Sequence, residues 1–250
     1  MKSITTVTAG VLLAMSVSAP AMAEDEPSPP PPPFSGGVEL GATIVSGNTE
    51  TTNIKGKVDA THIIGDLKNQ YLLDILYAED TGERSAERYY ALYQGDYPAE
   101  GKQYFFGMVD GEIDKFTDYE YIISSALGYG RRIIEQDTMT LIAEAGPGYS
   151  FKKYDDDLRP DDEDESDLIA RVKVDFWWQF SDSAEFGQLV TSNIALGDGS
   201  TITRSETYVS AALVGSLAMK LSYSVKHDTD PGPGNKSTDT TLAATLLYKF

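Results

Sequence analysis

Two histidines are the only imidazole side chains in the chain, and one of them stands where a hydrolase could place its base. His227 is followed by Asp228 and Asp230. A histidine beside a carboxylate can act as a general base, but a nucleophile must converge on the same point. The spacing names no nucleophile, so we expect no enzyme, and a hydrolase at the rim of the fold stays open as an alternative. For His62 the sequence gives even less indication of a catalytic role.

An acidic run between residues 155 and 167 is the second candidate site. Carboxylate oxygens are the ligands that Ca²⁺ and Mg²⁺ prefer, so the run could form a weak cation-binding loop. It does not fit an EF-hand, because Arg159 and Pro160 stand where that pattern needs Asp or Asn and Gly. A solvated loop that repels itself and cation enrichment at a pore mouth are the alternatives. The candidate ligands are Asp155, Asp156, Asp157, Asp161, Asp162, Glu163, Asp164, Glu165 and Asp167.

Composition excludes several other chemistries. The chain has no cysteine, so thiol chemistry and disulfides are absent. Its formal net charge of −19 argues against nucleic acid as a partner. Glycine pairs such as Gly128 and Gly130 precede no expected helix and no Lys-Ser/Thr ending, so they are not phosphate loops, and we expect no cofactor.

The first residues look like an export signal. Lys2 precedes a short apolar run, and Ala21-Met22-Ala23 offers a cleavage site. We expect residues 1–23 to be a signal peptide and residues 24–36, which are acidic and then proline-rich, to be an extended periplasmic spacer. The remaining segment, residues 37–250, is expected to form one domain.

Hydrophobic alternation with a period of two residues organises that domain. In 168–180, Leu168, Val172 and Phe176 share one face with other apolar residues, while Arg171 and Lys173 lie on the opposite face. The same alternation runs to Tyr248 and Phe250, which we expect to act as the C-terminal assembly signal. We predict twelve strands, with ten or fourteen as alternatives: 37–46, 50–63, 69–79, 86–97, 102–114, 119–134, 138–153, 167–180, 184–196, 203–214, 216–227 and 238–250.

The expected connections alternate in length. Short turns at 65–68, 98–101, 135–137, 181–183 and 215–216 alternate with generally longer or more polar segments at 47–49, 80–85, 115–118, 154–166, 197–202 and 228–237. This pattern is typical of an all-β, antiparallel, up-and-down transmembrane β-barrel of the bacterial outer membrane. Aromatic residues near the expected strand ends, among them Tyr119, Trp177 and Trp178, are expected at the membrane interface. A soluble β-sandwich is the alternative fold.

If the apolar faces meet lipid, the opposite faces line the barrel interior. The inward-facing candidates carry both signs of charge: Glu39, Lys55, Lys57, Asp59, Asp74, Glu144, Arg171, Lys173, Asp175, Lys220 and Lys226. A first hairpin centred on Asn48 would place Glu39 opposite Lys57, and we predict an ion pair between them. The phases of 86–97 and 102–114 stay ambiguous.

The chain resembles the salt-induced outer-membrane protein family, an uncharacterised family of expected β-barrels. The segments that carry the resemblance are 37–41 with 46–49, 127–132, 144–149, and the closing run 226–231, 236–239 and 247–250. The resemblance implies an outer-membrane barrel and no biochemical activity.

Three functions follow from these expectations. The first is a narrow, porin-like channel for small solutes or cations, the second a non-conducting barrel with a structural or envelope-stress role, and the third a rim hydrolase. The expected partners are outer-membrane lipid and, through the C-terminal strand, the barrel-assembly machinery.

Overall fold

The computed structural model describes residues 33–45, 51–155, 164–231 and 235–250, and these form strands and connections only. The expected signal peptide and nearly all of the expected spacer lie outside the described residues. In the described part, no helix is long and apolar enough to cross a bilayer. The strands are β1 (Phe34–Val45), β2 (Thr51–Ile64), β3 (Leu67–Asp80), β4 (Glu83–Pro98), β5 (Gln103–Asp114), β6 (Tyr119–Gln136), β7 (Met139–Tyr154), β8 (Glu165–Ser181), β9 (Ala184–Ala195), β10 (Ile202–Val214), β11 (Leu217–Asp228) and β12 (Thr238–Lys249).

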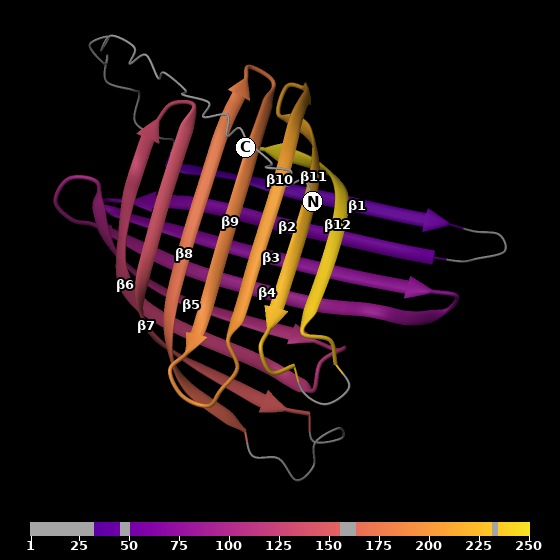
Figure 1. The fold of residues 1–250 in the computed structure, drawn as a ribbon. Coiled ribbons are helices and arrows are strands. Elements are labelled where there is room, and N and C mark those ends of the chain that lie inside the picture. Colours follow the sequence, from indigo (N-terminus) through magenta and orange to yellow (C-terminus); the bar gives the residue numbers. More distant parts are fainter. Residues whose placement is uncertain (1–32, 46–50, 156–163, 232–234) are drawn as a thin grey trace, which may run out of the picture. The chain divides into compact units, whose positions relative to one another are not determined.

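The twelve strands form one closed antiparallel barrel, as the alternation predicts. Each strand pairs with the next along the chain, and β1 pairs with β12 to close the sheet. Figure 1 shows β1–β4 crossing behind β8–β12 at a wide angle, as expected for strands that are tilted in a barrel. The predicted fold class and strand number are therefore confirmed.

The strand connections gather at two ends, which we call the turn end and the loop end. The turn end holds 65–66, 99–102, 137–138, 182–183 and 215–216, and the loop end holds the other connections. One predicted loop, 80–85, is wrong. Thr81 and Gly82 make a two-residue turn with φ angles of 53° and 81°, so β3 and β4 continue almost to the tip. Positive φ at both central residues is the geometry that matches the twist of a hairpin.

Strand alternation sends one face of each strand outward and the other into the barrel. In β8, Leu168 is 67% exposed, whereas Ile169 and Arg171 are 2% and 3% exposed. The predicted facing of this strand is correct. Exposed apolar side chains recur on the outer face of the other strands, for example at Leu127 and Leu242.

Near the turn end the interior wall formed by β5 and β6 is apolar, which explains why the sequence pattern leaves the facing of 102–114 ambiguous. Toward the loop end β5 turns Asp110 and Glu112 inward. Tyr104, Phe106, Met108 and Ala126 form a buried cluster inside the barrel, and Leu92 and Ile142 pack against it. The outer face of β5 is apolar too, with Phe105 exposed. A strand that is apolar on both faces has no alternation from which its phase can be inferred.

Two aromatic residues expected at the membrane interface turn inward instead. Tyr119 is buried and stacks on Tyr154, with ring centroids 4.9 Å apart. Trp177 donates its indole N–H to Glu185 Oε2 at 3.1 Å, while the neighbouring Trp178 faces outward. Each inward ring lies near a carboxylate that can accept its polar hydrogen, which the sequence pattern does not reveal.

Candidate functional site

The barrel interior gathers most of the charged side chains that the sequence singles out. Strand phase places all eleven interior candidates on the inward faces. Glu39, Lys55, Glu144, Arg171, Lys220 and Lys226 are buried, Lys57, Asp74, Lys173 and Asp175 are half-buried, and Asp59 is exposed near the turn end. Because charges removed from water need partners, the contacts of these groups decide whether the interior is open.

One cluster joins β1, β2, β10 and β11. Lys220 Nζ lies 2.7 Å from both Glu39 Oε1 and Glu206 Oε1. Lys57 Nζ lies 2.8 Å from Glu206 Oε2, so one carboxylate holds two lysines. The Lys220 ammonium also lies 4.3 Å from the centre of the Tyr208 ring. The strands β2 and β10 are separated by β1, β12 and β11, so the Lys57–Glu206 pair crosses the interior.

The predicted ion pair between Glu39 and Lys57 is wrong, although their register is right. The two residues are direct partners across β1 and β2, and both face inward. Each is instead ion-paired to a residue from β10 or β11, the lysine to Glu206 and the carboxylate to Lys220. The strong curvature of a small barrel brings inward side chains of non-adjacent strands together, so Glu39 reaches past β12 to Lys220 and Lys57 reaches as far as β10.

A second cluster lies nearer the loop end and joins β5 to β10 and β11. Glu112 is 4% exposed and accepts from Arg204 Nη2 at 2.8 Å and from Lys226 Nζ. Lys226 Nζ also lies 3.6 Å from Asp114 Oδ2. Beside this cluster, Arg171 of β8 lies 3.7 Å from Asp110 of β5. Four strands separate β5 from β10, so the Arg204–Glu112 pair also spans the interior.

A third cluster surrounds Glu144 of β7. Its Oε1 accepts from Tyr104 Oη at 2.7 Å, Gln94 Nε2 at 2.9 Å and Lys173 Nζ at 3.2 Å. Among the described residues, neither its buried Oε2 nor Arg171 Nε has a hydrogen-bond partner. Buried polar atoms of this kind usually bind ordered water, so they mark places where the interior can hold water.

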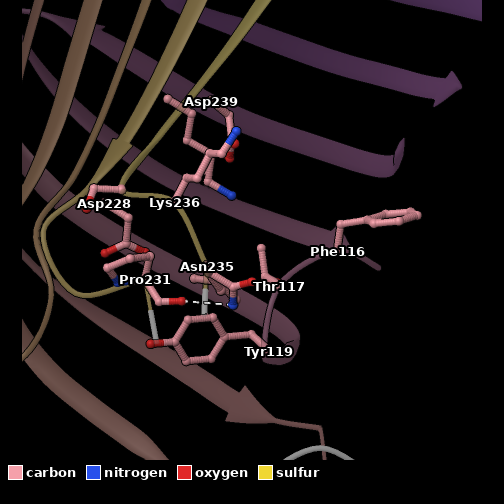
Figure 2. A pocket seen from close by; sticks show the side chains of 11 residues that line it. Phe116, Thr117, Tyr119, Asp228, Pro231, Asn235, Lys236 and Asp239 are labelled. Carbon is pink, nitrogen blue, oxygen red and sulfur yellow. Dashed lines mark hydrogen bonds between the residues drawn. The ribbon is translucent and has the colours of Figure 1, made fainter. Parts of the chain in front are cut away.

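Two loops from opposite walls meet at the loop end. Asn235 Nδ2, from the segment between β11 and β12, donates to Asp118 Oδ1 of the β5–β6 loop at 2.8 Å. A small cavity of about 50 Å³ lies beside this contact. Figure 2 shows Asn235 turned toward the Pro231 carbonyl and Phe116 pointing away from the other labelled side chains. The cavity is lined by Phe116, Thr117, Tyr119, Ile122, Lys226, Asp228, Pro231, Asn235, Lys236, Ser237 and Asp239. It has room for water.

Only part of the acidic run lies in the described residues. Asp156, Asp157, Asp161, Asp162 and Glu163 fall outside them, while Asp155, Asp164, Glu165 and Asp167 fall inside. Glu165 belongs to β8 and accepts from Lys152 Nζ at 2.6 Å and from the Ser200 N–H at 3.1 Å. Among the described residues, no group of three or more His, Asp or Glu is arranged to hold a metal ion. Cation binding by the run therefore stays a prediction.

The histidine and its neighbouring acid point to opposite sides of β11. His227 is exposed, and its Nδ1 lies 2.9 Å from Thr238 Oγ1. Asp228 is buried and accepts from the Asp230 N–H at 3.0 Å. Adjacent strand residues alternate in direction, so the sequence neighbours do not form a pair. His62 lies at the turn end against Phe34, with ring centroids 6.0 Å apart.

Several interior polar groups are not among the residues that the sequence pattern singles out. Glu112, Arg204 and Glu206 hold the cross-barrel pairs, and Gln94, Asp96, Asp110 and Lys152 are also buried. In β10 the run Thr203-Arg-Ser-Glu-Thr is polar at every position, so alternation gives no phase there. The apolar residues Val209 and Leu213 later in the same strand do give it, because they share the face opposite Arg204 and Glu206.

Three solved structures align with most of the chain at low sequence identity. The translocator domain of the autotransporter NalP from Neisseria meningitidis aligns with a TM-score of 0.46 and 12% identity, covering 87% of this chain and 88% of that one. The beta domain of the Bordetella autotransporter BrkA gives 0.40 and 11%, with coverages of 87% and 98%. The Pseudomonas putida toluene transporter TodX gives 0.36 and 10%, with coverages of 88% and 89%.

Sequence comparison with curated proteins gives no match. A family model does match, although its description names neither a salt response nor a location, so those parts of the resemblance stay predictions. The match runs over residues 38–250 and thus covers most of the chain, so the protein belongs to the family described as "Protein of unknown function, DUF481".

Proposed function

We propose that the protein is an outer-membrane β-barrel that does not conduct while its interior ion pairs are formed. The observation that carries this proposal is the pair of cross-barrel contacts. Lys57–Glu206 and Arg204–Glu112, both at 2.8 Å, join opposite walls at two levels. A barrel of about eight strands is filled by side chains, and one of about 16–18 strands leaves an aqueous channel. Twelve strands lie between these limits, so the interior side chains decide whether the barrel is open or closed.

The outer surface supports a membrane location. Large apolar side chains cover the outward faces of strands around the barrel, including Leu40, Ile54, Leu73, Val109, Leu127, Leu168, Leu221 and Leu242, all exposed. A soluble sandwich would bury such faces, whereas a transmembrane barrel turns them toward lipid. The interior is polar in most of the same strands, apart from the apolar cluster on β5 and β6, and a polar interior is the opposite of a soluble barrel core.

Energetics favours a closed interior over a standing pore. Separating a buried ion pair leaves two charges with little solvation, at a cost of roughly 3–5 kcal/mol for each pair broken. Glu206 and Glu112 each hold two cations, so opening a path past either one would disturb several contacts at once.

A narrow channel for small ions is the second candidate. The unpartnered atoms Glu144 Oε2 and Arg171 Nε favour it, because they mark sites where water can enter the interior. In this alternative, water and ions pass along the polar side chains without full separation of the pairs.

Planar-bilayer recording of the purified protein separates the two candidates. We expect silent bilayers for the wild type and discrete openings for Glu112→Gln and Glu206→Gln, because each removes the charge that two cations share. Glu120→Gln is the matched control, since Glu120 is 46% exposed and pairs with Lys153 on the surface. Regular wild-type openings with an ionic preference would overturn the closed barrel and establish the channel.

A further inference from the structure

The outer wall formed by β9 and β10 carries a patch of uncharged polar side chains. Its members share the outer strand faces of Ile194 and Val209, which are 39% and 44% exposed. On the opposite face of β10, Arg204 and Glu206 point into the interior. Figure 1 shows the two strands side by side between β8 and β11. The outer polar patch consists of Gln188 and Ser192 of β9 and Thr203, Ser205 and Thr207 of β10.

The outer polar patch lies within the apolar belt of the barrel and not at its edge. The register partner of Gln188 on β8 is Phe176. From there the outward apolar side chains of β8 continue in both directions, to Leu168 near the loop end and Trp178 near the turn end. In the middle of the other described strands, the outward positions are apolar, aromatic or glycine, apart from Ser125 of β6. Polar groups are costly to place against hydrocarbon, so the patch indicates a contact with something other than lipid chains.

Hydrogen bonds within the outer polar patch satisfy only part of its donors. Gln188 Nε2 donates to Ser205 Oγ at 2.9 Å, and Thr207 Oγ1 donates to Gln188 Oε1 at 2.5 Å. Ser192 Oγ and Thr203 Oγ1 lie 2.8 Å apart and share one hydrogen bond. Among the described residues, the Ser205 hydroxyl hydrogen and one hydrogen of the Ser192–Thr203 pair have no acceptor. Lipid chains offer none, so these donors need a partner that is itself polar.

The chemistry of the outer polar patch fits a second copy of this chain better than a lipid headgroup. Two barrels in one membrane share one orientation, so a twofold axis between them runs along the membrane normal. Each side chain near that axis then meets the same side chain of the other copy at the same depth. Like charges in this position would repel each other, whereas hydroxyl and carboxamide groups both donate and accept and can bond to their own copy. All members of the patch are of this self-complementary kind, and none offers a charge to a headgroup.

We propose that the protein forms a twofold dimer in the membrane through the outer polar patch, with Ser205 and Thr207 near the axis. These two residues hold the Gln188 carboxamide from both of its ends, so the centre of the contact is already ordered in one copy. The proposal rests on the membrane location proposed above. It is independent of the closed interior, because the outer polar patch and the interior ion pairs lie on opposite faces of β10.

Cross-linking through single cysteines locates the contact, because the chain contains no cysteine of its own. In membranes, Ser205→Cys and Thr207→Cys should each be joined to their own copy by a short thiol-specific cross-linker, since packed sheets lie about 10 Å apart. Val109→Cys, on the outer face of β5, is the matched control and should stay monomeric. Failure of both patch variants to cross-link, or equal cross-linking of the control, would overturn the proposal.

Energy transfer between labelled barrels in lipid vesicles measures the dimer affinity. Ser205→Ala combined with Thr207→Val removes both central hydroxyl groups from each copy with little change of shape. We expect the dimer affinity to fall roughly tenfold, as the loss of two hydrogen bonds within a membrane suggests. Ser125→Ala, the same kind of change on β6, should leave it unchanged. A wild type that stays monomeric at every protein-to-lipid ratio, or an undiminished affinity of the double variant, would end the proposal.

The failure of the dimer can be told apart from the failure of the proposed function. A chain that does not float with membranes would remove the membrane location on which both proposals rest. Conductance reports on the closed interior alone, whereas cross-linking and energy transfer report on the outer polar patch.

Discussion

Tyr208 lies directly across the sheet from Gly187, and its ring occupies the space where a glycine side chain would stand. A Cβ placed on Gly187 would lie 2.1 Å from Tyr208 Cε1. The same relationship holds between Tyr104 and Gly130. In each case an inward aromatic ring lies flat over a glycine on the next strand, which lets the sheet curve tightly and covers the glycine backbone.

Gly187→Ala should therefore destabilise the barrel, because the added methyl group displaces the Tyr208 ring and the Lys220 ammonium beside it. We expect a loss of roughly 1–3 kcal/mol, the usual cost of overpacking. Urea unfolding in lipid vesicles, followed by the fluorescence of Trp177 and Trp178, measures it. Gly56→Ala is the control, since its nearest contact would be Leu40 at 3.9 Å. Equal stability of both variants would contradict the steric argument.

Glu206→Gln should destabilise the protein more than Glu39→Gln does. Glu206 holds both Lys57 and Lys220. Its loss removes the one ion pair that Lys57 forms in the described residues, whereas loss of Glu39 leaves Lys220 paired. We expect about 3 kcal/mol for Glu206→Gln in the same unfolding assay. The surface variant Glu120→Gln should change stability by about 1 kcal/mol or less. A larger effect of Glu39→Gln would show that Glu206, which pairs with two lysines, does not contribute most to the stability of this cluster.

Lys152→Met should loosen the connection between β9 and β10. The Lys152 ammonium donates to Glu165 Oε1 and Ser200 Oγ, both at 2.6 Å, and so ties β7 and β8 to that connection. We expect faster hydrogen exchange in 196–201 with little change at the turn end. Lys153→Met, on the neighbouring half-buried side chain that pairs with Glu120, serves as the comparison. Unchanged exchange in 196–201 would mean that the loop holds its position without the lysine.

His227→Ala should leave both fold and chemistry unchanged. The imidazole faces outward, away from Asp228, and has one described hydrogen-bond partner, Thr238. We expect the wild type to hydrolyse neither ester nor peptide substrates and the variant to unfold within about 1 kcal/mol of it. Hydrolysis by the wild type that disappears in His227→Ala would support the alternative that the protein is a hydrolase with its site at the rim of the barrel.

The fold could be predicted in detail because most strands carry their own alternation of polar and apolar residues. In β8, lipid-facing and interior residues differ in polarity at almost every position, so the sequence alone places Arg171 and Lys173 inward. Alternation gives no answer where both faces are alike, as in the first half of β5, where Phe105 and Phe106 face opposite ways. Alternation also does not predict which interior charges form ion pairs with one another. The inward facing of Glu39 follows from alternation. The strand that supplies its ion-pair partner does not, because that depends on the curvature of the whole barrel and not on one hairpin.

The cross-barrel pairs also constrain how this protein can assemble. Lys57 and Glu206 are separated by 149 positions, and Lys220 and Glu39 by 181. A partly inserted sheet that held only the first strands would leave Lys57 and Glu39 without these partners, and one that held only the last strands would leave Glu206 and Lys220 with each other alone. Contacts so distant in sequence form late, since the whole intervening loop must close first. The barrel is therefore expected to enter the bilayer as a nearly complete sheet, with no stable half-barrel on the way.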